Sequence, residues 1–419
     1  MIGWATALFW ILVCLAVGQA LLTWRFVLAM RRYRVESTPD ARCPKVAVIL
    51  CLRGTDPFLP ACLQAILQQD YPNYDLHVVV DSREDPAWTT VDRVVARCGA
   101  THVTVRPLTA RRETCSLKCS SLRQAVSELD ASYEIIALLD ADTVPHRMWL
   151  RELVAPLADD EVAAATGNRW YMPASPSWGA LVRWLWNAGA AVIMYLWRIP
   201  WGGTLALKTS VLRQSDLLDR WGHAFCEDTM LYGELRRLGY RVAFVPSLMM
   251  VNRETCTLAN FHGWVRRQLL TARLYHPAWA LVVAHGLGVS ITQLTGVALL
   301  GVCAVMGYGS AAAWLAVGMG VYWGTMTGLL VAVERGVRRV SAARGEPTAW
   351  LGVAALPRVA VAMLLTQVLY PVALVSAAFL RTVQWRGVRY RVAGPGDIRL
   401  LDYRPYADNS RDEQRLGSL

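Results

Sequence analysis

Long uncharged segments near both ends of the chain constrain its architecture more than any other feature. Residues 2–22, 278–306 and 311–333 contain no Asp, Glu, Lys or Arg. A segment of about 20 apolar residues can cross a bilayer as a helix, because the helix satisfies its own backbone polar groups where lipid offers no partners. The sequence therefore predicts an N-terminal transmembrane helix within residues 1–30 and transmembrane or re-entrant helices within 278–380.

Arginines predict the orientation of these segments. Arg25, Arg31, Arg32 and Arg34 follow the first segment, so the positive-inside rule places the next part of the chain in the cytoplasm. The basic cluster follows the apolar run and no small-residue cleavage site stands out, which argues against a cleaved signal peptide. The net charge of +11 comes with arginines that flank apolar segments, so we expect anionic lipid headgroups as partners and no nucleic acid.

The last apolar stretch, residues 350–380, leaves two courses open. It contains Pro357, Arg358 and Pro371, and it could form one span with an interfacial lead-in helix or a re-entrant hairpin. The basic and aromatic segment that follows predicts an interfacial tail over residues 381–419, with Trp385 and Tyr390 at headgroup depth. A cover over an active site is the alternative. If the tail is cytoplasmic like the domain before these segments, the chain must cross the membrane an even number of times between them. One of the three apolar blocks then does not cross the membrane.

The ten cysteines predict neither a disulfide framework nor a zinc site. Cys14 and Cys303 lie in apolar segments, and Cys115 and Cys119 lack a second pair at zinc-binding spacing. Free cysteines are typical of a reducing compartment.

Residues 45–277 alternate strand-like and helix-like patterns, which predicts a mainly parallel α/β sheet with helices on both faces. We expect strands at 46–50, 76–80, 102–105, 133–139, 162–166 and 241–246. Helices are expected at 58–69, 91–98, 120–129, 149–157, 178–197 and 229–238. The apolar, tryptophan-rich helix at 178–197 is expected to pack on the sheet or lie at the bilayer interface, since a full span would place the later soluble part on the wrong side.

Acidic side chains gather where these elements end. The apolar run from Tyr133 ends in Asp140 and Asp142, and ligands of α/β sheets bind at the carboxyl ends of such strands. Two carboxylates there can hold a hard divalent cation that in turn holds a diphosphate, although a solvated turn has the same pattern. Asp85 and Asp228 also lie at the end of a predicted strand or the start of a predicted helix.

Two further motifs have both a structural and a functional interpretation. Glu227 and Asp228 precede a predicted helix, where they could cap it or supply a general base that takes a proton from a hydroxyl group. Gly202 and Gly203 precede a strand-like run at 204–206, where they could form a plain turn or allow close backbone approach to a substrate.

The order of these motifs resembles that of ceramide glucosyltransferases over nearly the whole chain. The matching motifs include Val46–Pro57, Asp70-Tyr71-Pro72-Asn73-Tyr74, Glu84-Asp85-Pro86-Ala87, Lys118, Leu139-Asp140-Ala141-Asp142, Gly202-Gly203, Glu227-Asp228, Arg266-Arg267-Gln268 and Gln384–Arg391. Each motif is weak alone, but their order and spacing make a strong joint signal.

The resemblance implies a membrane glycosyltransferase with the GT-A nucleotide-sugar-binding fold, an α/β, Rossmann-like domain. Such enzymes transfer a hexose, usually glucose from UDP-glucose, to the primary hydroxyl of a membrane lipid such as ceramide with inversion. By position, Asp228 would be the catalytic base, and Asp140 and Asp142 would hold Mn²⁺ or Mg²⁺. The resemblance also implies nucleotide-sugar contacts by Asp85, Lys118, Asp140 and Arg267, and acceptor or sugar contacts by Gly202, Gly203 and Glu227.

The chain also departs from the family pattern. The usual motif has Arg or Gln, two residues, then Arg-Trp, whereas here Trp264 occupies the first place and Gln268 replaces the tryptophan. Thr166 stands near a histidine of several relatives, and Cys51 replaces a common proline. These changes suggest a bacterial relative whose acceptor need not be ceramide; diacylglycerol, a hopanoid or a sterol are the alternatives. The expected location is the bacterial inner membrane.

Two other functions compete with transfer of one sugar to a lipid. A processive polysaccharide synthase of the cellulose or hyaluronan type shares the GT-A domain, but it needs more spans and usually keeps the tryptophan that Gln268 replaces. A non-catalytic membrane scaffold or transporter gives no reason for four carboxylates at element ends in this order.

Overall fold

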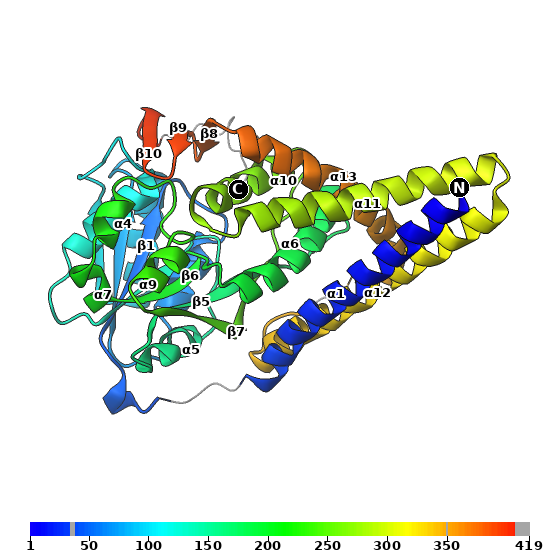
Figure 1. The fold of residues 1–419 in the computed structure, drawn as a ribbon. Coiled ribbons are helices and arrows are strands. Elements are labelled where there is room, and N and C mark those ends of the chain that lie inside the picture. Colours follow the sequence, from blue (N-terminus) through cyan, green and yellow to red (C-terminus); the bar gives the residue numbers. More distant parts are fainter. Residues whose placement is uncertain (34–37, 349–350, 407–419) are drawn as a thin grey trace.

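The computed structural model describes residues 1–33, 38–348 and 351–406. Arg34, Trp350 and residues 407–419 of the predicted tail lie outside the described residues. An α/β domain forms one part of the molecule, and long helices extend from it to one side (Figure 1).

A seven-stranded mixed sheet forms the centre of the α/β domain, with strand order β3-β2-β1-β4-β6-β5-β7. The first four strands, β1 (Val46–Leu52), β2 (Tyr74–Val80), β3 (Val103–Pro107) and β4 (Ile135–Leu139), are parallel, as predicted from their buried apolar runs. β6 (Thr204–Lys208) runs antiparallel to both β4 and β5 (Val162–Tyr171), a reversal that periodicity could not reveal. β7 (Arg241–Asn252) lies parallel to β5 at the edge.

β5 and β7 continue well beyond their predicted ends. The pairing register shifts between Thr166 and Asn168, where β5 is irregular. A Cβ atom on Gly167 would lie 2.3 Å from the carbonyl oxygen of Leu248, so the close approach of the two strands requires glycine here. The extension carries Asn168 and Arg169 beyond the level at which β4, on the other side of β6, ends.

Helices cover both faces of the sheet because alternate strand residues point to opposite sides. Val48 and Leu50 of β1 pack on one face against α2 (Leu59–Ile66), α3 (Pro86–Cys98) and α5 (Trp149–Val154), which η2 (Ala155–Ala158) continues. Ala47 and Ile49 pack on the other face against α4 (Leu117–Ser127), α7 (Thr209–Gln214), α8 (Leu217–Trp221) and α9 (Leu231–Arg237). A short η1 (Asp40–Arg42) precedes β1.

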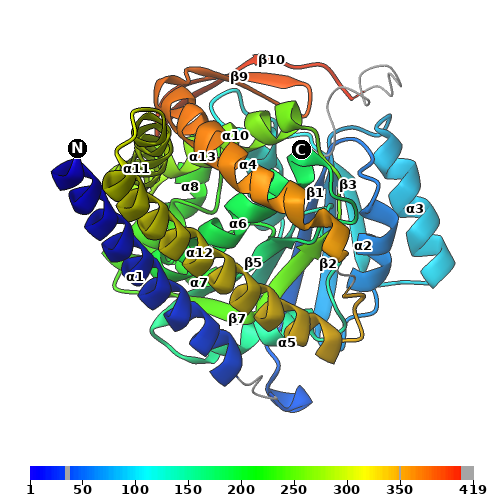
Figure 2. The same ribbon diagram turned by 90° about the vertical axis from the view of Figure 1, so that its right-hand side faces the viewer.

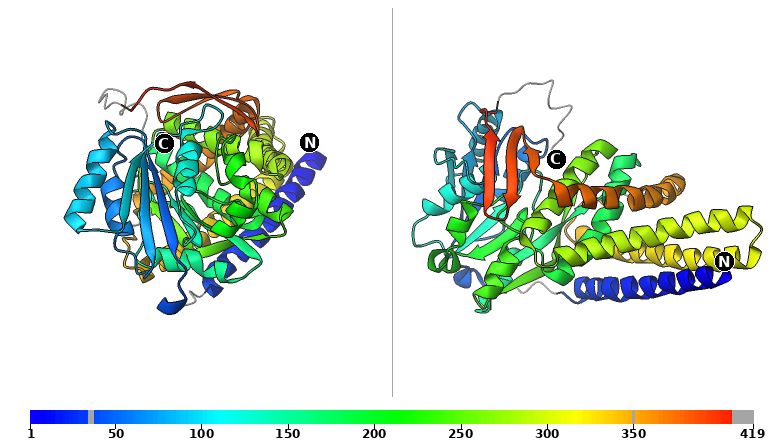
Figure 3. Two further views of the ribbon diagram at one scale, coloured as in Figure 1. Left: turned by 90° about the vertical axis from the view of Figure 1, so that its left-hand side faces the viewer. Right: turned by 45° about the horizontal axis from the view of Figure 1, so that its top comes forward.

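Four helical segments of the described chain are long and apolar enough to cross a membrane. They are α1 (Ile2–Arg32), α11 (Trp279–Val305), α12 (Gly309–Ala343) and Val353–Phe379, which comprises η3 (Val353–Ala355) and α13 (Leu356–Phe379). α1 lies along α12, and the two extend together away from the sheet (Figures 1 and 3). In Figure 2, which faces the long helices, α13 is seen in front of the α/β domain, and it packs against α10, α6 and α11.

α6 (Trp178–Trp197) and α10 (Leu258–Tyr275) connect the two parts of the molecule. Ten residues of α6 are buried, and the helix packs on β5, α10 and α13. Its predicted packing on the sheet is therefore confirmed.

Buried hydrogen bonds and an ion pair fix the end of α12 to the α/β domain. Glu334, which is 2% exposed, accepts hydrogen bonds from the indole N–H groups of Trp170 at 3.0 Å and Trp184 at 3.1 Å. Nearer the end of α12, Arg344 lies 3.0 Å from the buried carboxylate of Glu152. These bonds join the long helices and the α/β domain into one packed unit.

The chain after α13 forms a second, three-stranded antiparallel sheet of β8 (Thr382–Trp385), β9 (Val388–Gly394) and β10 (Asp397–Asp402). Arg386 and Gly387 connect β8 to β9 with φ of 48° and 74°, the left-handed geometry of a tight hairpin turn. Tyr390 is 1% exposed and accepts a hydrogen bond from the Leu117 N–H. Residues 382–402 thus pack on the α/β domain (Figure 3), which agrees with the covering alternative for this segment.

Candidate active site

One cavity of about 520 Å³ extends from the carboxyl end of β4 into the space between the long helices. Asp140, Asp142, Glu227 and Asp228 line its polar part, together with Lys118. Its other part is lined by residues of α1, α11, α12 and α13. The structure therefore brings together acidic residues that lie far apart in the sequence, and it joins them to a space within the predicted membrane segment.

Lys118 links two of the acidic positions. Its Nζ lies 2.8 Å from Asp140 Oδ1 and 2.7 Å from Glu227 Oε1. Burial by itself would lower the pKa of Lys118, but the attraction of Asp140, Glu227 and Asp228 raises it well above its ordinary value. Lys118 is therefore a fixed positive charge at the centre of three carboxylates.

Asp140 and Asp142 share a second cation, Arg169. One terminal nitrogen, Arg169 Nη2, lies 3.2 Å from Asp140 Oδ2 and 3.2 Å from Asp142 Oδ1. Burial acts to raise the pKa of Asp140, but Lys118 and Arg169 outweigh it and hold that pKa below its ordinary value. Burial raises the pKa of Asp142, for which Arg169 compensates only in part. Arg169 thus offsets part of the negative charge of the two predicted metal ligands.

Glu227 takes up a proton more readily than an ordinary glutamate. It is 1% exposed, and burial raises its pKa to about 7 although the nearby Lys118 lowers it. One lysine cannot fully compensate three carboxylates, and Glu227 is the most deeply buried of them. Glu227 therefore sets the charge of this cluster near neutral pH.

Asp228 is held by its neighbours with its carboxylate at the cavity. Its Oδ2 accepts a hydrogen bond of 2.8 Å from the Gly202 N–H, and its Oδ1 accepts bonds from the N–H and hydroxyl of Thr229. The predicted helix α9 begins at Leu231, and its N-cap Met230 makes no side-chain capping bond. Asp228 is therefore oriented by a loop and does not cap the helix that follows.

The two glycines approach the carboxylates of the site. A Cβ atom on Gly202 would lie 2.1 Å from Glu227 Oε1, and one on Gly203 would lie 2.7 Å from Asp140 Oδ2. Neither position tolerates a side chain without moving a charged group. Their predicted contact with a substrate stays a prediction.

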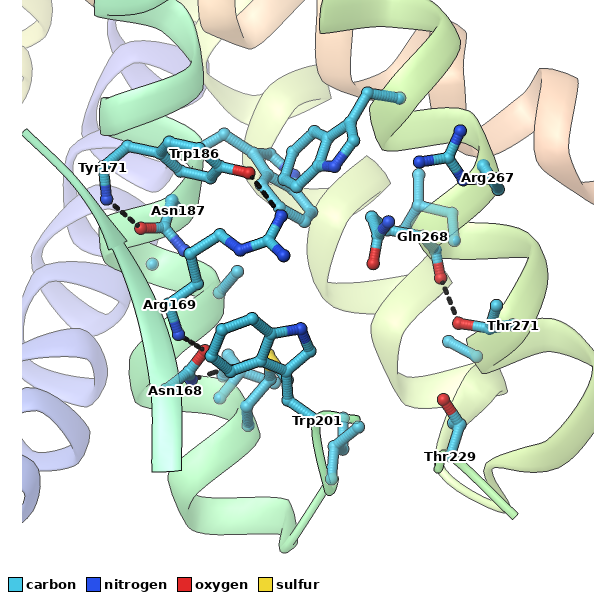
Figure 4. A pocket seen from close by; sticks show the side chains of 18 of the residues that line it. Asn168, Arg169, Tyr171, Trp186, Asn187, Trp201, Thr229, Arg267, Gln268 and Thr271 are labelled. Carbon is cyan, nitrogen blue, oxygen red and sulfur yellow. Dashed lines mark hydrogen bonds between the residues drawn. The ribbon is translucent and has the colours of Figure 1, made fainter. Parts of the chain in front are cut away.

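Two arginines face the polar part of the cavity from elements late in the chain. Arg267 of α10 lies over the ring of Trp385 at 5.4 Å, and no carboxylate of the described residues forms an ion pair with it. Burial and then the repulsion of Arg386 and Arg169 lower the pKa of Arg267 to about 10. Figure 4 shows Arg267 and Gln268 on one side of the pocket, and Arg169 on the other. Because Arg267 forms no ion pair within the described residues, its charge can act on an anion that enters the cavity.

Asp85 lies away from the cavity lining. It is the N-cap of α3 and accepts hydrogen bonds from the Ala87 N–H at 2.9 Å and from the Gly54 N–H. Two other buried carboxylates line the cavity near this loop: Asp56, which pairs with Arg386, and Asp81, which pairs with Arg53. The predicted nucleotide contact of Asp85 stays a prediction, and the structure shows that Asp85 positions the loop at Gly54.

Asp140 and Asp142 offer suitable oxygen ligands for Mn²⁺ or Mg²⁺. Among the described residues no group of three or more His, Cys, Asp and Glu side chains is placed to hold a metal ion. A cation bound through one or two carboxylates and substrate phosphates needs no third protein ligand. The two residues fit such a cation provided that Arg169 moves away from the space between them.

Sequence reasoning missed Arg169 and the hairpin residues Trp385 and Arg386 as parts of the site. A signal for Arg169 existed, since it follows the strand predicted at 162–166 just as Asp140 follows its own strand. The hairpin residues reach the cavity only because β8 to β10 fold back on the α/β domain.

Comparison with known proteins gives a family match over most of the chain. The family model of glycosyl transferase family 21 matches residues 8–398. A ceramide glucosyltransferase of Pyricularia oryzae is 43% identical over 61 residues, which are 14% of this chain and 12% of that protein. A probable glycosyltransferase of Bacillus subtilis, YdaM, is 24% identical over 55% of each chain. These matches thus cover about half, or less, of the length of the curated relatives.

Solved structures with a similar fold include two groups of glycosyltransferases. A mannosyltransferase of Pyrobaculum calidifontis, in complex with GDP-Man and Mn²⁺, is 20% identical with a TM-score of 0.48, covering 90% of this chain and 99% of that one. Glucosyl-3-phosphoglycerate synthase of Mycobacterium tuberculosis, in complex with Mn²⁺ and UDP-glucose, is 15% identical with a TM-score of 0.37, covering 57% and 83%. The predicted fold class is confirmed: a GT-A-type α/β domain with helices before and after it that are long and apolar enough to cross a membrane.

Proposed function

Because the chain belongs to glycosyl transferase family 21, we propose that it transfers a single hexose from a nucleotide diphosphate sugar to a hydroxyl group of a membrane lipid. Glucose from UDP-glucose is the proposed donor, and ceramide is the first candidate acceptor. The observation that carries the proposal is the single cavity that joins the charged cluster at β4 to the space between the long helices. A water-soluble donor and a lipid acceptor can meet there.

The charged residues divide into a donor side and an acceptor side. Arg267 and Arg386 would stabilise negative charge that develops on the leaving diphosphate. Asp140 and Asp142 would hold a divalent cation, which supplies further positive charge to that diphosphate when bound. Lys118 keeps Asp140 in place through a bond of 2.8 Å.

Asp228 is the proposed general base. The hydroxyl of a lipid is a poor nucleophile until a carboxylate accepts its proton in the transition state. The bonds from Gly202 and Thr229 fix the carboxylate, so that it need not reorient during the reaction. Inversion at the sugar needs one base on the face opposite the leaving group, so Asp228 suffices for a single displacement.

We further propose that the α/β domain faces the cytoplasm of a bacterial cell, with α1, α11 and α12 in the inner membrane. Arg31 and Arg32 end α1 on the side of the α/β domain, which favours the cytoplasm by the positive-inside rule. The chain contacts that domain after α12, where Arg253 donates to the carbonyl of Pro347, and again at the end of α13, where Arg273 of α10 donates to those of Ala377 and Leu380. These contacts favour a re-entrant or interfacial course for α13.

A transfer assay tests the proposed function. Membranes that contain the protein receive a panel of nucleotide sugars, a panel of lipids and Mn²⁺, and the products are separated by mass. We expect one singly glycosylated lipid, and a loss of rate of about 10²- to 10⁴-fold in Asp228→Asn. Asp219→Asn is the matched control, because Asp219 is an exposed aspartate in α8. A long polymer would support a processive synthase instead, and no turnover with any donor would refute both.

A second measurement tests the metal ligands. Asp142→Ala should weaken binding of the nucleotide diphosphate mainly when Mn²⁺ is present, because the carboxylate acts through the cation. Isothermal titration with UDP, with and without Mn²⁺, measures this difference. Equal affinities of wild type and variant in Mn²⁺ would refute the assignment.

A further inference from the structure

The membrane part of the cavity contains more polar side chains than a hydrocarbon chain needs. Gln19 of α1, His285 and Gln293 of α11 and Gln367 of α13 all line it. Polar side chains inside membrane segments are costly, and they are retained chiefly where they bind a ligand or each other. Their presence here raises the question of which groups they bind.

Most of these side chains have partners within the protein. Gln19 Nε2 contacts His285 Nε2, and the Ser290 hydroxyl donates to Gln367 Oε1 at 3.3 Å. Trp323 of α12 donates its indole N–H to Gln293 Oε1 at 2.7 Å. These bonds fix the polar groups to one another across the helices around the cavity.

The amide nitrogen of Gln293 is different. Gln293 is 1% exposed and lines the cavity, yet its Nε2 has no hydrogen-bond partner among the described residues. Because Trp323 occupies Oε1, the amide is oriented with Nε2 as its free donor. A buried donor without an acceptor is unfavourable, so an oxygen atom of a bound molecule would stabilise this arrangement.

Gln293 lies deep along α11. It follows Trp279, the first residue of the helix, by 14 residues, which is about 21 Å at a rise of 1.5 Å per residue. It also lies about 12 Å further along the helix than His285 by the same rise. A hydrocarbon core is about 30 Å thick, so this depth corresponds to the acyl region of a lipid and not to its headgroup.

We propose that Gln293 binds an oxygen atom that the acceptor lipid carries within its hydrocarbon portion, remote from the hydroxyl that receives the sugar. The acceptor class is then a lipid with an oxygenated chain or ring system, such as one with a mid-chain hydroxyl or keto group. A lipid whose oxygens all lie near the headgroup leaves Nε2 without a partner. This inference rests on the proposed function, because it assigns the occupant of the cavity as the acceptor.

Direct binding of two matched lipids tests the inference without any sugar transfer. The probes are ceramides with a 12-hydroxyoctadecanoyl or a plain octadecanoyl chain, added to the full-length protein in detergent micelles with no nucleotide sugar present. Native mass spectrometry measures the bound fraction of each lipid. We expect the wild type to prefer the hydroxylated lipid about tenfold, which corresponds to about 1.4 kcal/mol.

Two variants test whether Gln293 causes the preference for the hydroxylated lipid. Gln293→Leu keeps the approximate volume of the side chain but removes the donor, so this variant should bind the two lipids equally. Thr292→Val is the matched control, because Thr292 is adjacent on α11 but does not line the cavity, and it should keep the preference. Equal binding of both lipids to the wild type, or an unchanged preference in Gln293→Leu, would overturn the inference.

A parallel assay of sugar transfer to the same two lipids distinguishes failure of this inference from failure of the proposed function. Equal binding of the two lipids together with transfer of sugar to them overturns the role of Gln293 and leaves the proposed function intact. A Gln293-dependent preference without transfer to any lipid supports the binding site and counts against the proposed function.

Discussion

Arg169 would compete with a divalent cation for Asp140 and Asp142, the proposed metal ligands, and this competition can be measured. Arg169 Nη2 lies 3.2 Å from an oxygen of both Asp140 and Asp142, and its side chain is 13% exposed. A cation that bridges the carboxylates must occupy the space that this nitrogen takes. Arg169→Met removes the charge and keeps an unbranched side chain.

Two effects of opposite direction follow from the substitution. Removal of one partner from a buried ion pair costs about 3–5 kcal/mol, so the free energy of unfolding should fall by that amount in the presence of a chelator. The affinity for Mn²⁺ should rise, because the cation no longer displaces a charged hydrogen bond of about 1.5–3 kcal/mol. At 1.4 kcal/mol for each factor of ten, the dissociation constant falls about 10- to 150-fold.

Thermal unfolding in detergent micelles, followed by tryptophan fluorescence, measures both effects when Mn²⁺ is titrated. Bound metal stabilises the folded protein by about 1.4 kcal/mol for each tenfold excess over its dissociation constant. Arg169→Lys is the first control, since it keeps a cation without the planar fork of arginine. Arg241→Met is the second, because Arg241 forms exposed pairs with Asp159 and Glu161. Mn²⁺ binding no tighter in Arg169→Met than in wild type would refute the competition.

Three further predictions concern other parts of the site and its support. Gly202→Ala should lower the transfer rate at least tenfold, because its Cβ would lie 2.1 Å from Glu227 Oε1. Gly233→Ala is the control and should keep the rate, because the space around Gly233 is open. Steady-state kinetics of the two variants measure the difference. Burial raises the pKa of Glu227 from 4.5 to about 7, so the folded state binds more protons than the unfolded state between these values. Stability should therefore fall as pH rises from 4.5 to 7, and Glu227→Gln should flatten this slope in chemical denaturation; an unchanged slope would contradict the assignment. Arg344→Met should lower the free energy of unfolding by about 3–5 kcal/mol because it leaves Glu152 buried with one partner fewer, and a change below 1 kcal/mol would contradict this.

The strands and the acidic cluster could be predicted from the sequence because their signals are local. The apolar run that forms β4 ends directly at Asp140, and the rule that places ligands at carboxyl ends of strands needs no further information. Asp228 came into consideration because it directly precedes a predicted helix. The family resemblance then assigned roles that the residue types alone left open.

Other features depend on contacts between distant segments, which no local pattern records. Arg169 reaches Asp140 and Asp142 because β5 continues along β7 after an irregularity at Gly167. Arg386 reaches the site because a tight hairpin turn and two further strands fold back on the α/β domain. Asp85 has the expected position at a helix start, but its backbone partners at Gly54 and Ala87 show a capping role that competes with the predicted one.

The shared packing of the long helices and the α/β domain has a practical consequence for expressing this protein. Trp170 and Trp184 donate to Glu334, and Phe26 of α1 packs in the same apolar cluster as Phe244 of β7. A shortened polypeptide without α1 and α12 would expose these indole and phenyl groups to water. Removal of these long apolar helices would therefore lower the solubility of the α/β domain instead of raising it, so the full polypeptide in detergent or nanodiscs is the suitable material for biochemical work.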